Sequence, residues 1–288
     1  MTRLSVSVLW LLHFLPLPWL ARIGRALGTA LFWLAKERRH VADTNLRLCF
    51  PELTEIERRV LVKKNFQAFV RSLLERGILW WSPAERIQSL TRVIGFEHVQ
   101  AITPQPIILL APHFVGLDVA GSWLIQNVNL VSVYANQKNP IFHKLLLHGR
   151  SRFGNPQLYS RQQGLRPIVK AVKAGLPFYY LPDQDLATKD GLFVPFFGVP
   201  AATLNTVSRL ASMTGAKVIP VITRLLDDGS GYEVAFYPPW ENYPTDDLYA
   251  DTRRVNAFIE DRVREMPAQY FWLHKRFKTR PEGESGFY

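Results

Sequence analysis

The sequence predicts an α/β domain, with a central mixed sheet flanked by helices and an apolar segment at the N-terminus. After residue 92, short apolar runs of strand length alternate with longer amphipathic stretches, a pattern typical of a sheet covered by helices. The chain has 288 residues, of which 48% are hydrophobic, enough for one complete core. Because no repeat or low-complexity linker divides the chain, we expect residues 41–288 to form a single domain.

Residues 1–40 are expected to anchor the protein to a membrane. The apolar stretch 4–21 has about the minimum length that crosses a bilayer, but a histidine and two prolines interrupt it. It could therefore span the bilayer or lie at its interface, and a buried hairpin of a soluble protein is the alternative. The basic cluster at 36–40 then places the rest of the chain on the cytoplasmic side, by the positive-inside rule.

Residues 41–92 are expected to be a helical lead-in, because apolar positions recur at helical spacing between charged ones. The strands predicted after it are 107–111, 130–134, 177–181, 218–223 and 232–237. The helices predicted beside them are 118–126, 141–153, 165–174, 204–214 and 246–265. Ligands of open α/β sheets bind beyond the carboxyl ends of the strands, so chemistry is expected there.

A histidine follows the first of these strands. The run Ala-Pro-His-Phe-Val-Gly-Leu-Asp places His113 in a strand-to-helix turn and Asp118 about one turn into the next helix. On one continuous helix the two side chains would point roughly 140° apart, so they meet only if His113 precedes the helix. An imidazole can take a proton from an alcohol, while a carboxylate on its other nitrogen fixes the tautomer. A purely structural histidine is the alternative interpretation.

Two carboxylates follow a second strand. Asp183, Gln184 and Asp185 come directly after 177–181, and we expect them at the same rim of the sheet as His113. Such an Asp-x-Asp pair also suits a divalent cation holding a nucleotide-sugar diphosphate, as in glycosyltransferases. This chemistry therefore competes with proton transfer by the histidine.

The apolar run 191–198 is unsuited to a diphosphate but could line an acyl channel. Phe193, Phe196 and Phe197 are its candidate walls, and Gly198 at its end is counted with them as a substrate-binding residue. Ordinary core packing is the alternative interpretation of these rings.

The chain is basic, with 35 Lys and Arg against 24 Asp and Glu and a net charge of +11. This favours an acidic partner: anionic lipid, a phosphorylated substrate, an acidic carrier protein or nucleic acid. Lys275 and Arg276, in an aromatic and basic tail, are candidates for such contacts. Nucleic acid is disfavoured because no phosphate loop, zinc spacing or recognition helix accompanies the tail. Cys49 is the only cysteine, which excludes an internal disulfide and fits a cytoplasmic domain.

Four segments together resemble one known family. HFVGLD, at 113–118, resembles the His-x4-Asp block of the lysophospholipid and glycerolipid acyltransferase superfamily. Three longer segments resemble the bacterial lipid A late acyltransferases, the lauroyl and myristoyl transferases. They are NQKNPIFHKLLLHGRSRFG, LPDQDLATKDGLFVPFFGVPAATLNTVSRLA and QYFWLHKRFKTRP. The resemblance covers nearly the whole chain.

The resemblance implies a glycerolipid-acyltransferase-like fold and a catalytic acyltransferase domain at the cytoplasmic face of the bacterial inner membrane. It implies transfer of an acyl chain from acyl carrier protein to a hydroxyl of a Kdo-bearing lipid A precursor, with no metal and no organic cofactor. His113 matches the family's general base and Asp118 its acidic partner. Arg150 falls where the family has an arginine near this pair, and we expect it to bind Asp118 or a phosphate, with Arg152 as the alternative.

Other functions stay open at this point. Acyltransferases for glycerol phosphates usually have a Phe-Pro-Glu-Gly-Thr-Arg type block, and Leu-Pro-Asp-Gln-Asp stands in its place here, which disfavours that acceptor. Another glycolipid or phospholipid acceptor, ester hydrolysis, a binding role and a metal-dependent glycosyltransferase are the alternatives.

Overall fold

The structure, a computed structural model, describes residues 3–186 and 191–288. Its central sheet has the strand order β1-β9-β8-β2-β5-β3-β4. These strands are β1 (Thr91–Ile94), β2 (Ile107–Leu110), β3 (Val131–Tyr134), β4 (Gln157–Ser160), β5 (Phe178–Tyr180), β8 (Lys217–Leu225) and β9 (Tyr232–Phe236). All neighbours pair in parallel except β8 and β9, which are antiparallel. The predicted α/β fold with a mixed central sheet is confirmed.

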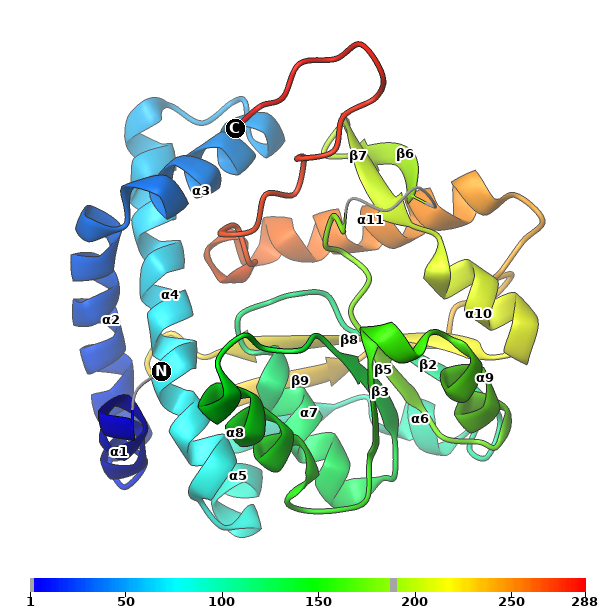
Figure 1. The fold of residues 1–288 in the computed structure, drawn as a ribbon, viewed down its shortest axis with the longest axis horizontal. Helices are drawn as coiled ribbons and strands as arrows, with labels where there is room; N and C mark the ends of the chain where they lie inside the picture. The colour runs from blue at the N-terminus through cyan, green and yellow to red at the C-terminus, as the bar shows by residue number, and fades with distance from the viewer. Residues whose placement is uncertain (1–2, 187–190) are drawn as a thin grey trace.

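Helices cover both faces of this sheet (Figure 1). On one face lie α9 (Arg166–Lys173), α10 (Thr206–Thr214) and α11 (Leu248–Glu265), and on the other α5 (Ala84–Leu90), α6 (Glu97–Gln100) and α7 (Leu117–Asn127). The remaining helices are α1 (Arg3–Leu12), α2 (Leu17–Leu34), α3 (Lys36–Cys49), α4 (Glu55–Trp81) and α8 (Pro140–Ser151). Each predicted strand and helix after residue 92 corresponds to one of these elements within a few residues.

Strand β2 lies between two hydrophobic cores. All four of its residues are buried, and because side chains alternate along a strand, Ile108 and Leu110 enter one core while Ile107 and Leu109 enter the other. This explains the unbroken apolar run in the sequence. The turn after β2 is therefore held on a strand packed on both faces.

Four strands were missed by the sequence analysis. β1 and β4 are the two edges of the sheet, where half-exposed polar residues replace the apolar run of a central strand. A separate antiparallel hairpin contains β6 (Gly191–Phe196) and β7 (Val199–Leu204). Its turn has positive φ at Phe197 (51°) and Gly198 (78°), the backbone that a two-residue hairpin turn with two left-handed residues requires.

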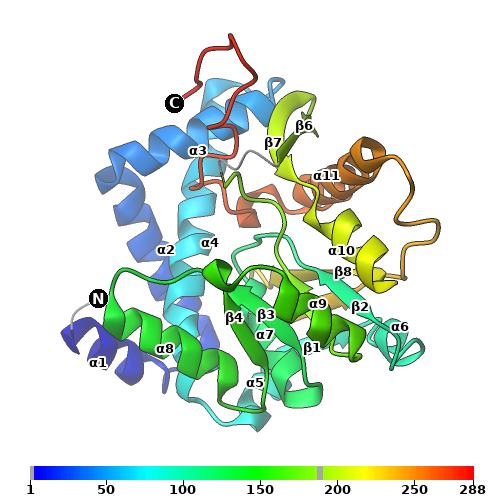
Figure 2. The same ribbon diagram turned by 45° about the vertical axis from the view of Figure 1, so that its right-hand side comes forward.

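The apolar N-terminal segment forms two helices that break at Pro16. α2 runs alongside α4 (Figures 1 and 2). Their backbones are close, since a Cβ on Gly24 or Gly28 would lie 2.6 Å from the Cα of Arg71 or 2.5 Å from the Cα of Gln67. In the two described ranges, no helix has the length and apolar character needed to cross a bilayer.

Candidate active site

His113 lies in the turn between β2 and α7, as the sequence predicts. Its carbonyl accepts a hydrogen bond from the Phe271 N–H (2.9 Å), and the Val115 N–H donates to the Gln269 carbonyl (2.8 Å). A β-bridge joins Phe114 to Tyr270. The C-terminal segment therefore holds the backbone of this turn on both sides of the histidine, whose side chain stays 16% exposed.

The partner of the His113 imidazole is Asp183. Leu110 pairs with Tyr180 in the β2–β5 register, so His113 and Asp183 each stand three residues beyond a paired position. The His113 Nδ1 lies 2.7 Å from Asp183 Oδ1, and the His113 backbone N–H donates to Asp183 Oδ2 at 2.9 Å. With Nδ1 engaged in this way, Nε2 is the ring nitrogen left to take a proton.

Tyr270 completes this arrangement by donating its hydroxyl to Asp183 Oδ2 at 2.8 Å. Burial alone raises the pKa of Asp183, but the His113 charge and the hydrogen bonds from His113 and Tyr270 outweigh burial and lower it below its usual value. Burial and the nearby Asp183 charge raise the pKa of Tyr270, so its hydroxyl stays a donor. The carboxylate is thus held anionic beside the imidazole.

Asp118 does not occupy the position that the sequence analysis expected. Its Oδ2 accepts from Arg76 Nε at 2.9 Å and its Oδ1 from Arg150 Nη2 at 3.2 Å. Burial raises the pKa of Asp118, yet the charges of Arg76 and Arg150 outweigh it and lower the pKa. The expected contact with His113 is therefore corrected: two guanidinium groups take this carboxylate, and Asp183 takes the imidazole. The ion pair expected between Arg150 and Asp118 is present.

Two adjoining cavities meet at this site. The first, of about 220 Å³, is lined by His113, Arg150 and Gln184 among others. The second, of about 40 Å³, is mostly apolar and has Asp118 and Gly121 in its wall. The two share Leu146, Arg150, Tyr179 and Leu181. A cavity of mixed lining that contains the histidine therefore adjoins a small apolar one, an arrangement that suits a substrate with a polar head and an apolar chain.

Comparison with known proteins decides the family. A family model described as bacterial lipid A biosynthesis acyltransferase matches residues 1–279. The chain belongs to this family. The resemblance noted in the sequence is thereby confirmed, and the protein is an acyltransferase.

Curated relatives of this acyltransferase have the same enzyme class. It is 38% identical to a lipid A biosynthesis lauroyltransferase of Escherichia coli strain K12, over 98% of this chain and 93% of that one. It is 33% identical to the palmitoleoyltransferase of the same strain, over 100% and 94% of the two chains. It is also 33% identical to the myristoyltransferase, over 93% and 82%.

Among solved structures, a 1-acyl-sn-glycerophosphate acyltransferase, PlsC, from Thermotoga maritima matches over 85% of this chain and 97% of that one. The identity is 14% and the TM-score 0.38. A likeness this low supports no inference about the site.

The Asp-x-Asp pair of this acyltransferase is divided between two tasks. While Asp183 serves His113, Asp185 accepts from the Thr279 N–H (2.8 Å) and the Thr279 hydroxyl (2.9 Å). The Asp185 N–H donates to His274 Nε2 at 3.1 Å. Both carboxylates are thus occupied by different protein donors, which disfavours their joint binding of one cation and with it the glycosyltransferase interpretation.

Several predicted substrate contacts of the acyltransferase hold the fold instead. Arg152 donates to the carbonyls of Leu79 (3.1 Å) and Ser82 (2.6 Å), beside the end of α4. Arg276 is buried and donates to the Ala202 carbonyl (2.9 Å) and the Thr203 hydroxyl (2.8 Å). The expectation that Arg276 meets an anionic ligand is therefore corrected, because this side chain is buried and the hairpin accepts from its Nη1 and Nη2.

Lys275 lies with its ammonium 5.6 Å from the centre of the Tyr288 ring.

The predicted acyl-channel walls are also corrected. Phe196 is fully buried against Tyr270 and Phe277, with ring centres 6.0 and 6.2 Å away. Phe197 and Gly198 form the hairpin turn, and Phe193 is 37% exposed. Neither the His113 cavity nor the apolar cavity has any of them in its described lining.

Sequence reasoning missed two residues of this site. Arg76 stands on α4 among other charged residues, and nothing in its local pattern separates a buried charge from a solvated one. Tyr270 belongs to the tail block quoted for the resemblance, but no spacing ties it to Asp183, which is 87 residues away. Both contacts depend on how distant elements pack.

Proposed function

We propose that this acyltransferase transfers a fatty acyl chain from acyl carrier protein to a hydroxyl of a Kdo-bearing lipid A precursor. The observation that carries the proposal is the His113–Asp183 pair, because His113 lines a cavity that adjoins a mostly apolar one. The names of the curated relatives support lipid A as the acceptor.

In the proposed mechanism His113 acts as general base. Its Nε2 takes the proton of the acceptor hydroxyl while the hydroxyl oxygen attacks the thioester carbonyl carbon. The Asp183 carboxylate stabilises the imidazolium that forms and keeps Nδ1 protonated. The carbon–sulfur bond then breaks, and the imidazolium returns the proton to the leaving thiol. The scheme needs no metal, no organic cofactor and no acyl-enzyme.

Arg150 is proposed to supply positive charge at this step. It lines both cavities while paired with Asp118, and a guanidinium can stabilise a developing oxyanion or hold an acceptor phosphate. Asp118 and Arg76 then act as positioning residues that fix this guanidinium. Gln184, in the same cavity wall, offers an amide to the acceptor or donor.

The acyl chain is proposed to enter the apolar cavity. Its lining comes mainly from the C-terminal end of α4, from α7 and from α8. Gly121 stands in this wall, and a Cβ there would make only an ordinary contact, 3.8 Å from Tyr179 Cε1. This glycine therefore leaves room for about one methyl group at the wall of the cavity.

We further propose that the protein works at the cytoplasmic face of the bacterial inner membrane, with α1 and α2 resting on the bilayer. Large apolar side chains of these helices and of the turn between them are exposed, among them Leu11, Phe14, Trp19 and Leu34. Such side chains are suited to the acyl boundary of a membrane. The net charge of +11 suits both anionic lipid and an acidic carrier protein.

Mass spectrometry tests the reaction. Purified protein is incubated with a mixed acyl-carrier pool and the tetra-acylated Kdo-bearing lipid A precursor, beside His113→Ala. A mass gain of one acyl chain, absent in the variant, is the expected result. Free fatty acid without acylated acceptor would favour hydrolysis, and no product at all would remove this lipid as the acceptor.

A further inference from the structure

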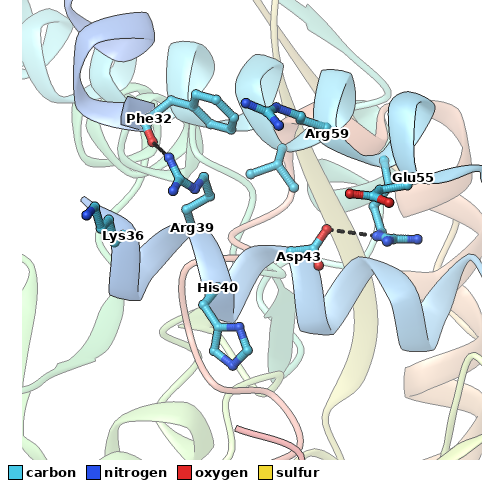
Figure 3. A pocket seen from close by; sticks show the side chains of 9 residues that line it. Phe32, Lys36, Arg39, His40, Asp43, Glu55 and Arg59 are labelled. Carbon is cyan, nitrogen blue, oxygen red and sulfur yellow. Dashed lines mark hydrogen bonds and ion pairs between the residues drawn. The ribbon is translucent and has the colours of Figure 1, made fainter. Parts of the chain in front are cut away.

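A third cavity, of about 320 Å³, lies between the start of α3 and the first turns of α4 (Figure 3). It shares no lining residue with the two cavities at His113. We call it the α3–α4 pocket. Its basic lining residues are Lys36, Arg39, His40, Arg58 and Arg59. No part of the proposed acyl transfer uses them.

The charges in this pocket do not balance. Asp43 and Glu55 are its two carboxylates, against four arginine and lysine side chains. Arg58 is paired with Asp43, with 2.8 Å between Nε and Oδ1. Lys36 and Arg59 make no ion pair with a described carboxylate. The pocket therefore keeps positive charge available for an anion.

Arg39 is positioned by neutral groups. Its Nη1 donates to the Phe32 carbonyl at 2.9 Å (Figure 3), and its guanidinium lies 5.2 Å from the centre of the Phe32 ring. Helix α3 begins at Lys36 without a side-chain cap, so its positive end adds to the field in the pocket. A guanidinium fixed without a carboxylate partner is suited to a phosphate oxygen.

Exposed apolar side chains lie close in sequence to the residues that line the pocket. Trp33 and Leu34 end α2, one residue before α3, and are 54% and 79% exposed, and Ile56 in the first turn of α4 is 77% exposed. The Arg59 guanidinium lies 5.0 Å from the centre of the Trp33 ring. Positive charge beside apolar surface matches an amphiphile at a bilayer better than an acidic protein or a free anion, because neither of these needs the apolar rim.

We propose that the α3–α4 pocket binds the phosphate group of an anionic membrane phospholipid, with the acyl chains of that lipid against Trp33, Leu34 and Ile56. The proposal rests on the proposed membrane location and adds a lipid-selective contact separate from the acyl-transfer site. Lys36, Arg39 and Arg59 are the residues that hold the phosphate. The contact selects anionic over zwitterionic membranes and helps to fix how the protein lies on them.

Vesicle sedimentation tests this proposal. The full-length protein is mixed with vesicles of phosphatidylcholine alone or with about one third phosphatidylglycerol. Wild type is expected to prefer the anionic vesicles, and Lys36→Glu combined with Arg59→Glu to bind them about 30-fold more weakly, since each basic contact contributes about fivefold. The conservative pair Lys36→Arg and Arg59→Lys is expected to keep the preference.

The matched control reverses the same charge elsewhere. Lys170→Glu with Lys173→Glu changes exposed lysines of α9 and is expected to retain most of the binding. An equal loss of vesicle binding in this control would show that only the net charge of the protein matters, and it would contradict phosphate binding in the pocket. Displacement of the protein by inorganic phosphate, beyond that by chloride at equal ionic strength, would assign the pocket to a free anion and overturn the lipid assignment.

Acyl transfer to acceptor dispersed in detergent separates the two proposals. The Lys36→Glu and Arg59→Glu protein is expected to keep wild-type turnover in this assay, although its binding to anionic vesicles is weakened. If the wild type prefers anionic vesicles but transfers no acyl chain, the proposed function is contradicted and the proposed pocket is not. Equal vesicle binding by wild type and the double variant would contradict the pocket alone.

Discussion

At the scale of single residues, the site depends on which carboxylate meets which cation. The pattern His-x4-Asp places His113 and Asp118 close in sequence, and the structure brings both to the same pair of cavities. It nevertheless assigns them different partners, because Arg76 and Arg150 converge on Asp118 while Asp183 arrives from the neighbouring strand. Sequence spacing identifies the neighbourhood, whereas the pairing depends on packing between elements.

Asp118→Asn is expected to destabilise the protein. The substitution leaves Arg76 and Arg150, which are 22% and 28% exposed, without a counter-charge. We expect a loss of about 2 kcal/mol in the free energy of unfolding, less than for a fully buried pair because water reaches these groups. Urea denaturation measures it. The control is Asp261→Asn, which breaks an exposed ion pair with Arg264 and is expected to change the free energy of unfolding by less than about 0.5 kcal/mol. Equal losses in the two variants would contradict the pairing of Asp118 with Arg76 and Arg150.

His274 is expected to make stability depend on pH. Burial, followed by the charges of Lys278 and His113, lowers the pKa of His274 from 6.5 to about 4. Between pH 6.5 and 4 the unfolded chain binds a proton that the folded protein does not. The free energy of unfolding therefore falls as pH falls through this window, by about 3 kcal/mol in total. Above pH 6.5 the contribution is fully present.

Denaturation of wild type and His274→Gln at a series of pH values checks this expectation. The glutamine keeps an acceptor for the Asp185 N–H but does not titrate. The two proteins should have similar stability above pH 6.5, and the wild type should become less stable than the variant as the pH falls toward 4. Identical slopes in both proteins would show that His274 is not the group that titrates.

At the scale of elements, the sequence predicts the central strands well and the edges poorly. β2 is an apolar run because both of its faces are buried, and this leaves a clear pattern. β1 and β4 are half-exposed edges with no such run. The run 191–198 could have lined an acyl channel or packed in the core; it forms β6 and the hairpin turn, and Phe196 packs against Tyr270 in the core. Apolar composition alone does not separate a cavity wall from a core.

The walls of the apolar cavity should set the acyl length. On α7, Gly121→Leu fills space that Gly121→Ala leaves largely open. We expect Gly121→Leu to change the ratio of kcat/KM for dodecanoyl over octanoyl carrier protein by about tenfold or more in favour of the shorter chain. Gly121→Ala should change it little and, in a helix interior, stabilise the fold. An unchanged ratio in the leucine variant would place the acyl chain elsewhere.

At the scale of the whole molecule, charge and apolar surface point to the same environment. The excess of basic residues and the exposed apolar side chains of α1 and α2 both suit an anionic membrane surface. Composition predicts the sign of the partner's charge, but it does not locate the contacts. The α3–α4 pocket depends on two helices that approach each other only in the folded chain.

The proposed association with acyl carrier protein is expected to depend on salt. Because a basic protein and an acidic carrier attract over distances that salt screens, raising sodium chloride from about 50 to about 300 mM is expected to raise the KM for acyl carrier protein about tenfold. The kcat should change little, since the buried His113–Asp183 pair is poorly screened. Steady-state kinetics with detergent-dispersed acceptor measures both constants. A KM independent of salt would contradict an electrostatic encounter.

The central claim is that the His113–Asp183 pair performs acyl transfer, and the kcat of Asp183→Asn tests it most directly. The variant keeps the size of the side chain but removes the charge that stabilises the His113 imidazolium. We expect kcat to fall by about a thousandfold or more with little change in KM, while circular dichroism shows a folded protein. A folded Asp183→Asn protein with kcat within about tenfold of wild type would contradict the account.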